Sequence, residues 1–389
     1  MTIYLIVLLA IFNQIGLKGS KMLVALYALD FGTSPFTIGL LVAMYAVLPL
    51  LLAVYAGRIS DRVGVRWPML MGSLGMTIGL LLPTLTPSIA LLFFSATLIG
   101  VANVFFHVPV HNLIGSLGEG HARVNNFNTF ALGASLSGTL GPLSVGLIID
   151  LAGYRITYVW LAAIAIIPAL VLVFHGRFFP PAIKQSKEGQ AGRMMELVGD
   201  RAMRNTIITS AVIVSGIEMF NFYMPIHGRS IGLSASMIGV ILSMQTAAAF
   251  VIRLWLPWMS RRYGEMRILT GSLIMAGVTY FIFPIFHQPA ILAAISFLLG
   301  LSLGCGQPLS ITQTYNHSLP GRSGEALGIR ITANKFTQIA VPVLFGSIGS
   351  VFGIYPIFWS NGLLLLFGGY LTGRGEKLPE CGQDPAKSP

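Results

Sequence analysis

Charged residues are scarce in this sequence. Asp, Glu, Lys and Arg make up 10% of its 389 residues, whereas hydrophobic residues make up 54%. Soluble domains carry about 25% charged residues, and a water-soluble chain of this composition would expose apolar patches large enough to drive aggregation. In a lipid bilayer the same composition is expected, because lipid-facing surfaces are apolar and helices satisfy their own backbone hydrogen bonds. The composition therefore indicates a membrane protein.

The sequence contains only two cysteines and no recognisable ATP-binding loop. The two cysteines, Cys305 and Cys381, lie far apart in the sequence, which argues against a disulfide framework or a metal motif built on cysteine. The sequence contains no Gly-x4-Gly-Lys-Ser/Thr loop and so offers no ATP site of that type. It also lacks the alternating pattern of a transmembrane β-barrel. We expect no cofactor and no bound metal.

Apolar runs long enough to cross a bilayer are what the sequence does contain. A helix crosses the hydrocarbon core of roughly 30 Å with about 20 apolar residues. The first run lacks the basic start and the cleavage site of a secretory signal, so it counts as a span. The runs predict an all-α membrane protein with twelve transmembrane helices, at approximately 3–29, 35–56, 67–86, 88–115, 122–150, 155–175, 205–229, 234–257, 266–286, 289–316, 325–351 and 354–373.

Basic residues are distributed unevenly over the predicted loops. Of the 24 lysines and arginines, seventeen fall on one side of the membrane, two on the other and five within spans. By the positive-inside rule the richer side is cytoplasmic, so both termini are expected in the cytoplasm. The net charge of +11 is then a consequence of topology, and no nucleic-acid partner is expected.

The second half of the chain repeats the first at an offset of 200 residues. Such a repeat predicts two six-helix bundles related by a pseudo-two-fold axis along the membrane normal, with a solute site between them near mid-depth. We expect one bundle at 1–175, a cytoplasmic linker at 176–204, a second bundle at 205–373 and a cytoplasmic tail at 374–389. The positions with an identical partner 200 residues later include Gly16, Gly32, Ser34, Ile38, Gly39, Ser60, Arg62, Gly64, Gly100, Pro142, Gly146 and Gly153.

A compact charged motif lies between the second and third spans. It reads Gly57-Arg-Ile-Ser-Asp61-Arg62-Val-Gly64-Val-Arg66. The glycines permit a tight turn, and the charges sit where helix ends carry partial charges. An ordinary basic loop is the alternative interpretation.

This motif resembles the loop signature of the major facilitator superfamily, G-x-L-x-D-R-x-G-R-K/R. Ile59 replaces the leucine and Val65 replaces the first basic residue of that pattern. A degenerate copy precedes Gly264, with Arg261 at the position of Asp61. The resemblance implies a solute transporter of the bacterial inner membrane rather than an enzyme. It also implies a conformational latch, formed by Gly57, Asp61, Arg62, Gly64 and Arg66.

The fifth span carries a second pattern, in which Gly138, Gly141, Pro142 and Gly146 recur on a small-residue helix. It is similar to a signature of proton-coupled drug and metabolite antiporters of the same superfamily, although Val145 stands where a second glycine is typical. The alternative is close helix packing without any bearing on transport direction. In the fourth span Ala96 stands where many proton-coupled exporters carry arginine.

Ionisable residues within the spans are costly in a bilayer and are therefore functional candidates. Glu218 is the one carboxylate near mid-depth, and the offset of 200 pairs it with Lys18. We predict that Glu218 exchanges a proton during transport and that Lys18 tunes it; a static ion pair is the alternative. His107 and His111 are second-choice proton carriers, although each could be a packing residue.

Further polar and aromatic side chains are predicted to line the solute site. With so many cations and amides, the substrate is expected to carry an anionic group that Arg330 or Lys335 binds. Alternatively, Arg330 extends to the membrane edge, which is also the role expected of Arg253. The predicted lining residues are Gln14, Lys21, Asn103, His111, Asn221, Tyr223, Gln245, Gln307, Arg330, Asn334, Lys335 and Gln338.

These features together favour a monomeric secondary transporter that works by alternating access. Proton-coupled efflux of a small organic compound, such as a drug, a metabolite or a siderophore-like molecule, is the favoured function. Proton-coupled uptake of an organic anion is the alternative. A membrane-embedded enzyme or a receptor is a remote third possibility, because no paired carboxylates, metal-binding histidine set or signalling domain is recognisable.

Overall fold

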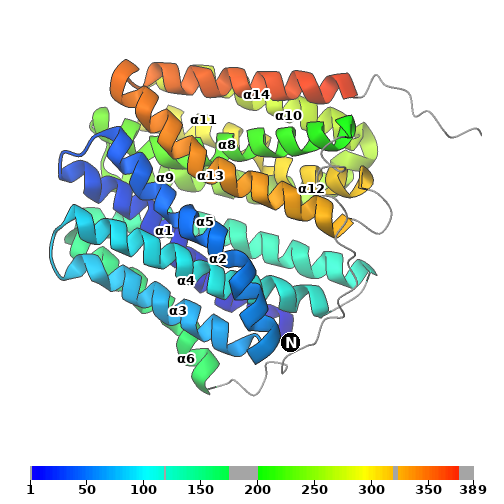
Figure 1. Cartoon of the computed structure of the whole chain (residues 1–389). Helices are drawn as coiled ribbons and strands as arrows, with labels where there is room; N and C mark the ends of the chain where they lie inside the picture. Colours follow the sequence, from blue (N-terminus) through cyan, green and yellow to red (C-terminus); the bar gives the residue numbers. More distant parts are fainter. Residues whose placement is uncertain (1, 118–119, 175–199, 319–322, 376–389) are drawn as a thin grey trace, which may run out of the picture.

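Helices account for all the regular structure in the part of the chain that the computed structural model describes, namely residues 2–117, 120–174, 200–318 and 323–375 (Figure 1). The first half contains α1 (Thr2–Asp30), α2 (Pro35–Val63), α3 (Arg66–Leu81), α4 (Ile89–Ser116), α5 (Gly120–Ala165) and α6 (Ile167–Phe174). The second half contains α8 (Arg201–Ser230), α9 (Ala235–Tyr263), α10 (Glu265–Ile282), α11 (Pro289–Gly304), α12 (Gly306–Asn316), α13 (Ser323–Phe352) and α14 (Tyr355–Gly375). Short 3-10 turns follow α3 at Leu82–Thr84 and α10 at Phe283–Ile285.

The helices match the predicted twelve-span architecture. Ten described segments are long and apolar enough to cross a membrane. The longest of them, Asn126–Phe174, breaks at Gly153, where φ is +77°, and so supplies two spans. The remaining span is α14, which packs along α10 and α8. The predicted all-helical, twelve-span fold is therefore confirmed.

The repeat at 200 residues is visible in the backbone. All six described residues with positive φ are glycines, and they form three pairs at this offset: Gly32 with Gly232, Gly64 with Gly264, and Gly153 with Gly353. A side chain would be strained at each of these turns.

The helix starts repeat in the same way. The hydroxyls of Ser34 and Ser234 accept hydrogen bonds from the backbone N–H groups of Thr37 and Met237, so they cap α2 and α9 identically.

The predicted segment boundaries differ slightly from the helices. The second half begins with α8 at Arg201, which Asp200 caps, so α8 starts inside the predicted linker 176–204. Residues 176–199 of that linker and 376–389 of the predicted tail lie outside the described residues. The division into domains at these positions stays a prediction.

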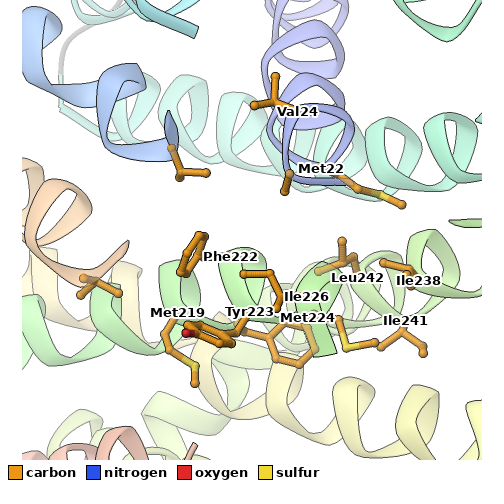
Figure 2. Close-up of a cluster of buried hydrophobic side chains, with 14 of the residues drawn as sticks. Met22, Val24, Met219, Phe222, Tyr223, Met224, Ile226, Ile238, Ile241 and Leu242 are labelled. Carbon is orange, nitrogen blue, oxygen red and sulfur yellow. The ribbon is translucent and has the colours of Figure 1, made fainter. Parts of the chain in front are cut away.

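The main contacts between the halves involve three pairs of helices. These are α5 with α9, α2 with α13, and α1 with α8, and α2 also touches α8. One hydrophobic core runs across the contact, because its buried members come from both halves. Figure 2 shows part of this core, with Met22 and Val24 of α1 on one side and Phe222, Ile226 and Leu242 on the other.

The two ends of the bundle differ in how the halves meet. We call the end that carries Gly32 and Gly232 the far end, and the end that carries Arg62 and Arg262 the basic end. At the far end the halves are joined by an ion pair between Asp30 and Arg229, with 2.9 Å between the oxygen and the nitrogen.

Backbone packing at the far end is close and reciprocal. A Cβ added at Gly39 would lie 2.3 Å from the carbonyl oxygen of Pro342, and one added at Gly239 would lie 2.4 Å from that of Pro142. Only glycine permits such an approach of two helices. The far end is thus closed by direct contact between the halves.

Candidate functional site

A buried ion pair joins the two halves in the middle of the molecule. The Nζ atom of Lys21 on α1 lies 3.1 Å from Oε2 of Glu218 on α8, and the two side chains are 20% and 9% exposed. Lys18, the lysine that the repeat pairs with Glu218, acts on the carboxylate through its charge, but Lys21 and not Lys18 forms the ion pair. Lys18 and Lys21 lie one turn apart on the same helix, and an approximate symmetry does not determine which of two such lysines reaches the carboxylate.

Two further lysines surround this pair. Glu218 interacts electrostatically with Lys18 and Lys335 as well as with Lys21. Lys18 forms no hydrogen bond to any residue that the structure describes. The cluster thus sets three ammonium groups against one carboxylate, and a buried surplus of charge is costly unless a counter-ion balances it. We call these four residues the charged cluster.

Two histidines of α4 lie beside the charged cluster. His107 forms a hydrogen bond through its Nε2 atom with the side-chain amide of Gln14 on α1. The His107 and His111 rings are 5.8 Å apart between centroids, and Phe130 of α5 packs against both. His111 is exposed, so it remains accessible at this depth. No group of three potential metal-binding side chains is found among the described residues.

The predicted lining residues on α13, namely Arg330, Asn334, Lys335 and Gln338, form a polar stripe that divides into two parts. Arg330 is 3% exposed and donates to Ser310 Oγ at 3.1 Å and to Gln307 Oε1 at 2.8 Å, both on α12. Asn334 accepts a hydrogen bond from Ser210 of α8. These contacts stay within the second half, so Arg330 neither extends to the membrane edge nor reaches the charged cluster.

The other part of the stripe belongs to the charged cluster. Lys335 interacts electrostatically with Lys18, Lys21 and Glu218, and its Nζ atom donates to Gln338 Oε1 at 3.2 Å. Of the two predicted anion-binding residues, Lys335 is thus the one placed at the contact between the halves.

Other predicted lining residues differ in their surroundings. Tyr223 is fully buried in the second half, where its hydroxyl donates to the carbonyl oxygen of Phe345, so it does not line a site between the halves. In Figure 2 its ring lies deep among the second-half side chains, whereas Phe222 lies nearer to α1. Asn221 is half-buried on α8.

Several amides have buried polar atoms without a hydrogen-bond partner among the described residues, including the predicted lining residues Asn103 and Gln245. The side-chain oxygen of Asn103 on α4 and both polar atoms of Gln245 on α9 have no hydrogen-bond partner among the described residues. Such groups are normally paired with protein, water or a ligand. Both amides therefore remain candidates for contact with a bound molecule.

Two residues that join the halves were not recognised from the sequence. Arg253 of α9 donates to the carbonyl oxygen of Ala131 at 3.2 Å and to Ser135 Oγ at 2.7 Å, both on α5. It bridges the halves, and the expectation that it anchors the helix at the membrane edge is wrong. An apolar span gives no signal of the direction in which an arginine points, because lipid-facing and protein-facing positions are equally apolar.

The second of these residues is Asp150, which lies just before the break of α5 at Gly153. It accepts hydrogen bonds from the backbone N–H groups of Ala235 at 3.1 Å and Ser236 at 2.8 Å, and also from the Ser236 hydroxyl. One half thereby caps the first turn of a helix in the other half. The sequence did offer a signal for this contact. Asp150 is a lone aspartate at the end of a predicted span, and a Ser-rich helix start follows 85 residues later.

The predicted latch lies at the basic end. Gly64 ends α2, and the Arg66 side chain donates to the carbonyl oxygens of Leu172 and Val173 at the end of α6. Arginine is favourable there because the last carbonyls of a helix carry partial negative charge. Gly57 is half-buried and Arg62 is exposed.

The Asp61 side chain lies outside what the structure describes. The proposed release of this latch during transport stays a prediction.

The glycines of the fifth span lie where helices approach closely. A Cβ at Gly138 would lie 2.9 Å from Thr246 of α9, and one at Gly146 would lie 2.3 Å from the carbonyl oxygen of Ala235. Gly141 faces α1 at Gly19. Pro142 presents its carbonyl to Gly239, as described above. The pattern therefore coincides with the contact between α5 and its neighbours in both halves.

Twelve membrane spans in two repeated halves, with charged residues at their contact, are typical of a secondary transporter of the membrane. The family model of the Major Facilitator Superfamily matches residues 6–336 and 206–380. The chain belongs to this superfamily.

Curated relatives show low sequence identity to this chain, but the similarity extends over most of its length. A "Multidrug resistance protein MdtG" of Enterobacter lignolyticus (strain SCF1) is 23% identical over 323 residues, which cover 82% of this chain and 77% of the relative. The protein of the same name from Klebsiella pneumoniae (strain 342) is 24% identical over 317 residues, covering 80% of this chain and 76% of the relative.

Solved structures share the fold. A POT family transporter in complex with a thioalcohol-conjugated peptide superposes with a TM-score of 0.80 at 12% identity and covers 96% of both chains. A POT family transporter in complex with 5-aminolevulinic acid gives a TM-score of 0.79 at 12% identity, covering 95% of each chain. The protein is thus a multi-pass membrane transporter of this fold.

Proposed function

We propose that this transporter exports a small organic compound in exchange for protons, with Glu218 as the coupling carboxylate. The observation that carries the proposal is the ion pair between Glu218 and Lys21, which joins the two halves at the contact of α1 with α8. We place the protein in a bacterial inner membrane with both termini in the cytoplasm. The uneven distribution of basic residues supports this orientation.

The chemistry of the pair suggests how coupling works. Alternating access requires the halves to separate at one end and close at the other, which strains contacts between α1 and α8. Movement of α1 away from α8 takes both Lys21 and Lys18 away from Glu218. A buried carboxylate that loses two of its three cations is strongly disfavoured, so the helices can part readily only when a proton neutralises Glu218. Protonation releases the pair, and deprotonation on the other side restores it.

Substrate charge follows from the remaining lysines. Lys18 and Lys335 leave positive charge that Glu218 does not balance. An anionic group on the substrate would supply the missing counter-ion. The direction of efflux is favoured by the names of the curated relatives and by the glycine pattern of α5.

Uptake of an organic anion together with protons is the second candidate. The same surplus of lysines favours it, as does Ala96 at the position of the exporters' arginine. Both functions use Glu218 in the same chemical role but differ in the pH gradient that drives accumulation.

A vesicle assay tests the proposal and separates the two directions. Purified protein in liposomes receives a pH gradient of either sign, and accumulation of an organic anion such as salicylate or a drug such as ethidium is followed. Antiport predicts accumulation when the interior is acid, and symport predicts it when the exterior is acid.

The role of Glu218 is tested in the same assay with Glu218→Gln. We expect this variant to lose gradient-driven accumulation by at least about 100-fold, the scale of a lost proton-transfer group, while it retains exchange of labelled for unlabelled substrate. Asp30→Asn removes a carboxylate outside the cluster and serves as the matched control. Full accumulation by Glu218→Gln would eliminate Glu218 as the coupling residue.

A further inference from the structure

A cavity whose lining combines apolar side chains with several polar ones lies inside the second half, away from the charged cluster. It has a volume of about 360 Å³ and opens between α8, α10, α12 and α14 at the basic end. This volume is at the small end of the range for sites that bind small molecules. The buried polar side chains that line it are Thr206, Thr209, Ser310, Gln313 and Thr372, each less than 10% exposed. We call this space the second-half cavity.

The first half provides an internal comparison for this region. At the positions 200 residues earlier the chain carries Ile6, Leu9, Val110, Leu113 and Leu172. All five are at most 1% exposed and belong to one hydrophobic cluster, formed by α1, α3, α4 and α6. The same place in the repeated fold is therefore filled by aliphatic side chains in one half and lined by hydroxyls and an amide in the other.

The comparison shows that the fold itself does not require a polar cavity here. Aliphatic side chains would contribute hydrophobic and packing energy at each of the five positions. Polar side chains give up that stabilisation, so their presence around an open space is typical of a binding site rather than of a packing core.

The hydrogen bonds of the lining define what the cavity offers. The hydroxyls of Thr206 and Thr372 donate to the carbonyl oxygens of Ala202 and Gly368. Thr209 must then donate to the Thr372 hydroxyl, which lies 3.2 Å away, because a hydroxyl has one proton. The protons of all three threonines are thus used within the protein. The Thr206 oxygen already lies 3.3 Å from Nδ1 of His317, so the oxygens of Thr209 and Thr372 are the ones that remain as acceptors.

Gln313 adds a further acceptor. Its amide nitrogen donates to Glu265 Oε2 at 3.1 Å, which leaves the amide oxygen to accept. Charges in the lining are balanced, because Asp200 and Arg201 carry opposite signs. Asn205 and His317 also line the cavity and can donate, so the second-half cavity is suited to an uncharged molecule with hydroxyl groups, which both donate and accept.

One contact connects the cavity to the transport pathway. Ser310 lines the cavity and also accepts the hydrogen bond from Arg330 of α13. Arg330 lies on the same helix as Lys335 of the charged cluster. A molecule bound against Ser310 would thus contact the helix that contributes to the solute site.

We propose that the second-half cavity is a separate binding site for a small, uncharged, hydroxyl-rich molecule, distinct from the site between the halves. The hydroxyl groups of such a molecule would donate to Thr209 and Gln313. Bound ligand would stabilise the arrangement of α8, α10, α12 and α14 in which the cavity is open.

Thermal unfolding of the full-length protein in detergent tests this proposal. The probes are glycerol, erythritol, xylitol and glucose, with fully O-methylated glucose as the probe without donors and gluconate as the charged one. Polyols stabilise proteins generally at high concentration, so each shift is compared with that of two variants. Thr209→Leu/Thr372→Leu copies the residues of the first half, and Thr209→Val/Thr372→Val keeps the side-chain shape but removes both hydroxyls.

We expect at least one polyol to raise the Tm of the wild type by about 2–4 °C more than that of either variant. O-methylated glucose and gluconate should show no such difference. Equal shifts in the wild type and both variants for every polyol would overturn the proposal, as would a larger difference with gluconate than with the polyols.

Glu218→Gln separates this proposal from the proposed transport mechanism. Its polyol response should equal that of the wild type, whatever its transport activity, because Glu218 does not line the second-half cavity. Loss of the polyol response in Glu218→Gln would place the polyol in the site between the halves and contradict a separate site.

Discussion

Lys21 and Lys18 differ in one contact although both belong to the charged cluster. Lys21 donates a hydrogen bond to Glu218, whereas Lys18 acts on the carboxylate only through its charge. A hydrogen bond between charged groups contributes about 1.5–3 kcal/mol to stability. A desolvated cation without a hydrogen-bond partner contributes little and can even be unfavourable. The two lysines should therefore respond differently to the same substitution.

We predict that Lys21→Met lowers the free energy of unfolding by about 2 kcal/mol. Lys18 and Lys335 still balance the charge of Glu218 in this variant, so the loss stays below that of a fully isolated carboxylate. Lys18→Met, the matched control, should be neutral within about 0.5 kcal/mol or slightly stabilising. Thermal unfolding of the purified variants measures both. A larger loss for Lys18→Met than for Lys21→Met would show that Lys18 is the dominant partner.

At the scale of helices, the far end depends on two reciprocal contacts. Gly39 of α2 lies against Pro342 of α13, and Gly239 of α9 lies against Pro142 of α5. In each case the carbonyl oxygen of a proline inside one helix occupies the space that a side chain on the other helix would need. These contacts set the distance between the halves.

We predict that Gly239→Ala and Gly39→Ala each lower the free energy of unfolding by about 1–3 kcal/mol, because the added methyl group forces two backbones apart. Gly271→Ala is the control, since no atom outside its own helix lies within 4 Å of the added Cβ. That change should leave stability unchanged or raise it by up to about 1 kcal/mol, the helix propensity gained over glycine. Thermal unfolding compares the three variants, and equal stability of all three would contradict tight packing at Gly39 and Gly239.

The existence and order of the helices could be predicted from the sequence, but their rotation could not. The first predicted span, 3–29, matches α1 at Thr2–Asp30, because an apolar run between polar ends is enough to place a span. Rotation about the helix axis depends on which face meets protein, and in a bilayer both faces are apolar. For this reason the directions of Tyr223 and Arg253 were wrongly predicted, and Lys21 was not distinguished from Lys18.

The repeat could have revealed more of the structure than the spans did. Comparing each residue with the one 200 positions later contrasts Ile6 with Thr206, Leu9 with Thr209, and Leu113 with Gln313. This contrast indicates a polar region that only the second half contains. Its open volume could not be predicted, because that depends on how the side chains of four helices pack.

At the scale of the whole molecule, the described contacts between the halves close the far end. The Asp30–Arg229 pair is partly exposed, with side chains 33% and 48% accessible. Exposed ion pairs contribute about 0.2–1 kcal/mol. Asp150 makes three hydrogen bonds to the first turn of α9, and removing a helix-capping aspartate costs about 0.5–2 kcal/mol. Asp150 should therefore contribute more than the ion pair to holding the far end closed.

We predict that Asp150→Ala shifts the transporter towards the state that is open at the far end, by up to about 30-fold for 2 kcal/mol. Arg229→Ala should shift it by no more than about 5-fold for 1 kcal/mol. Ser350→Ala is the matched control, because Ser350 is the repeat partner of Asp150 and its hydroxyl donates within α13, to Ser347.

The shift is measured as the labelling rate of a single cysteine, Asn221→Cys, in a Cys305→Ser/Cys381→Ser background. A membrane-impermeant maleimide is added to intact cells and reaches this position only through an open far end, if that end faces outwards as the basic residues indicate. We expect the rate to increase in the order Ser350→Ala, Arg229→Ala, Asp150→Ala. An unchanged rate in Asp150→Ala, together with labelling in inside-out vesicles, would mean that this cap does not govern the closure of the far end.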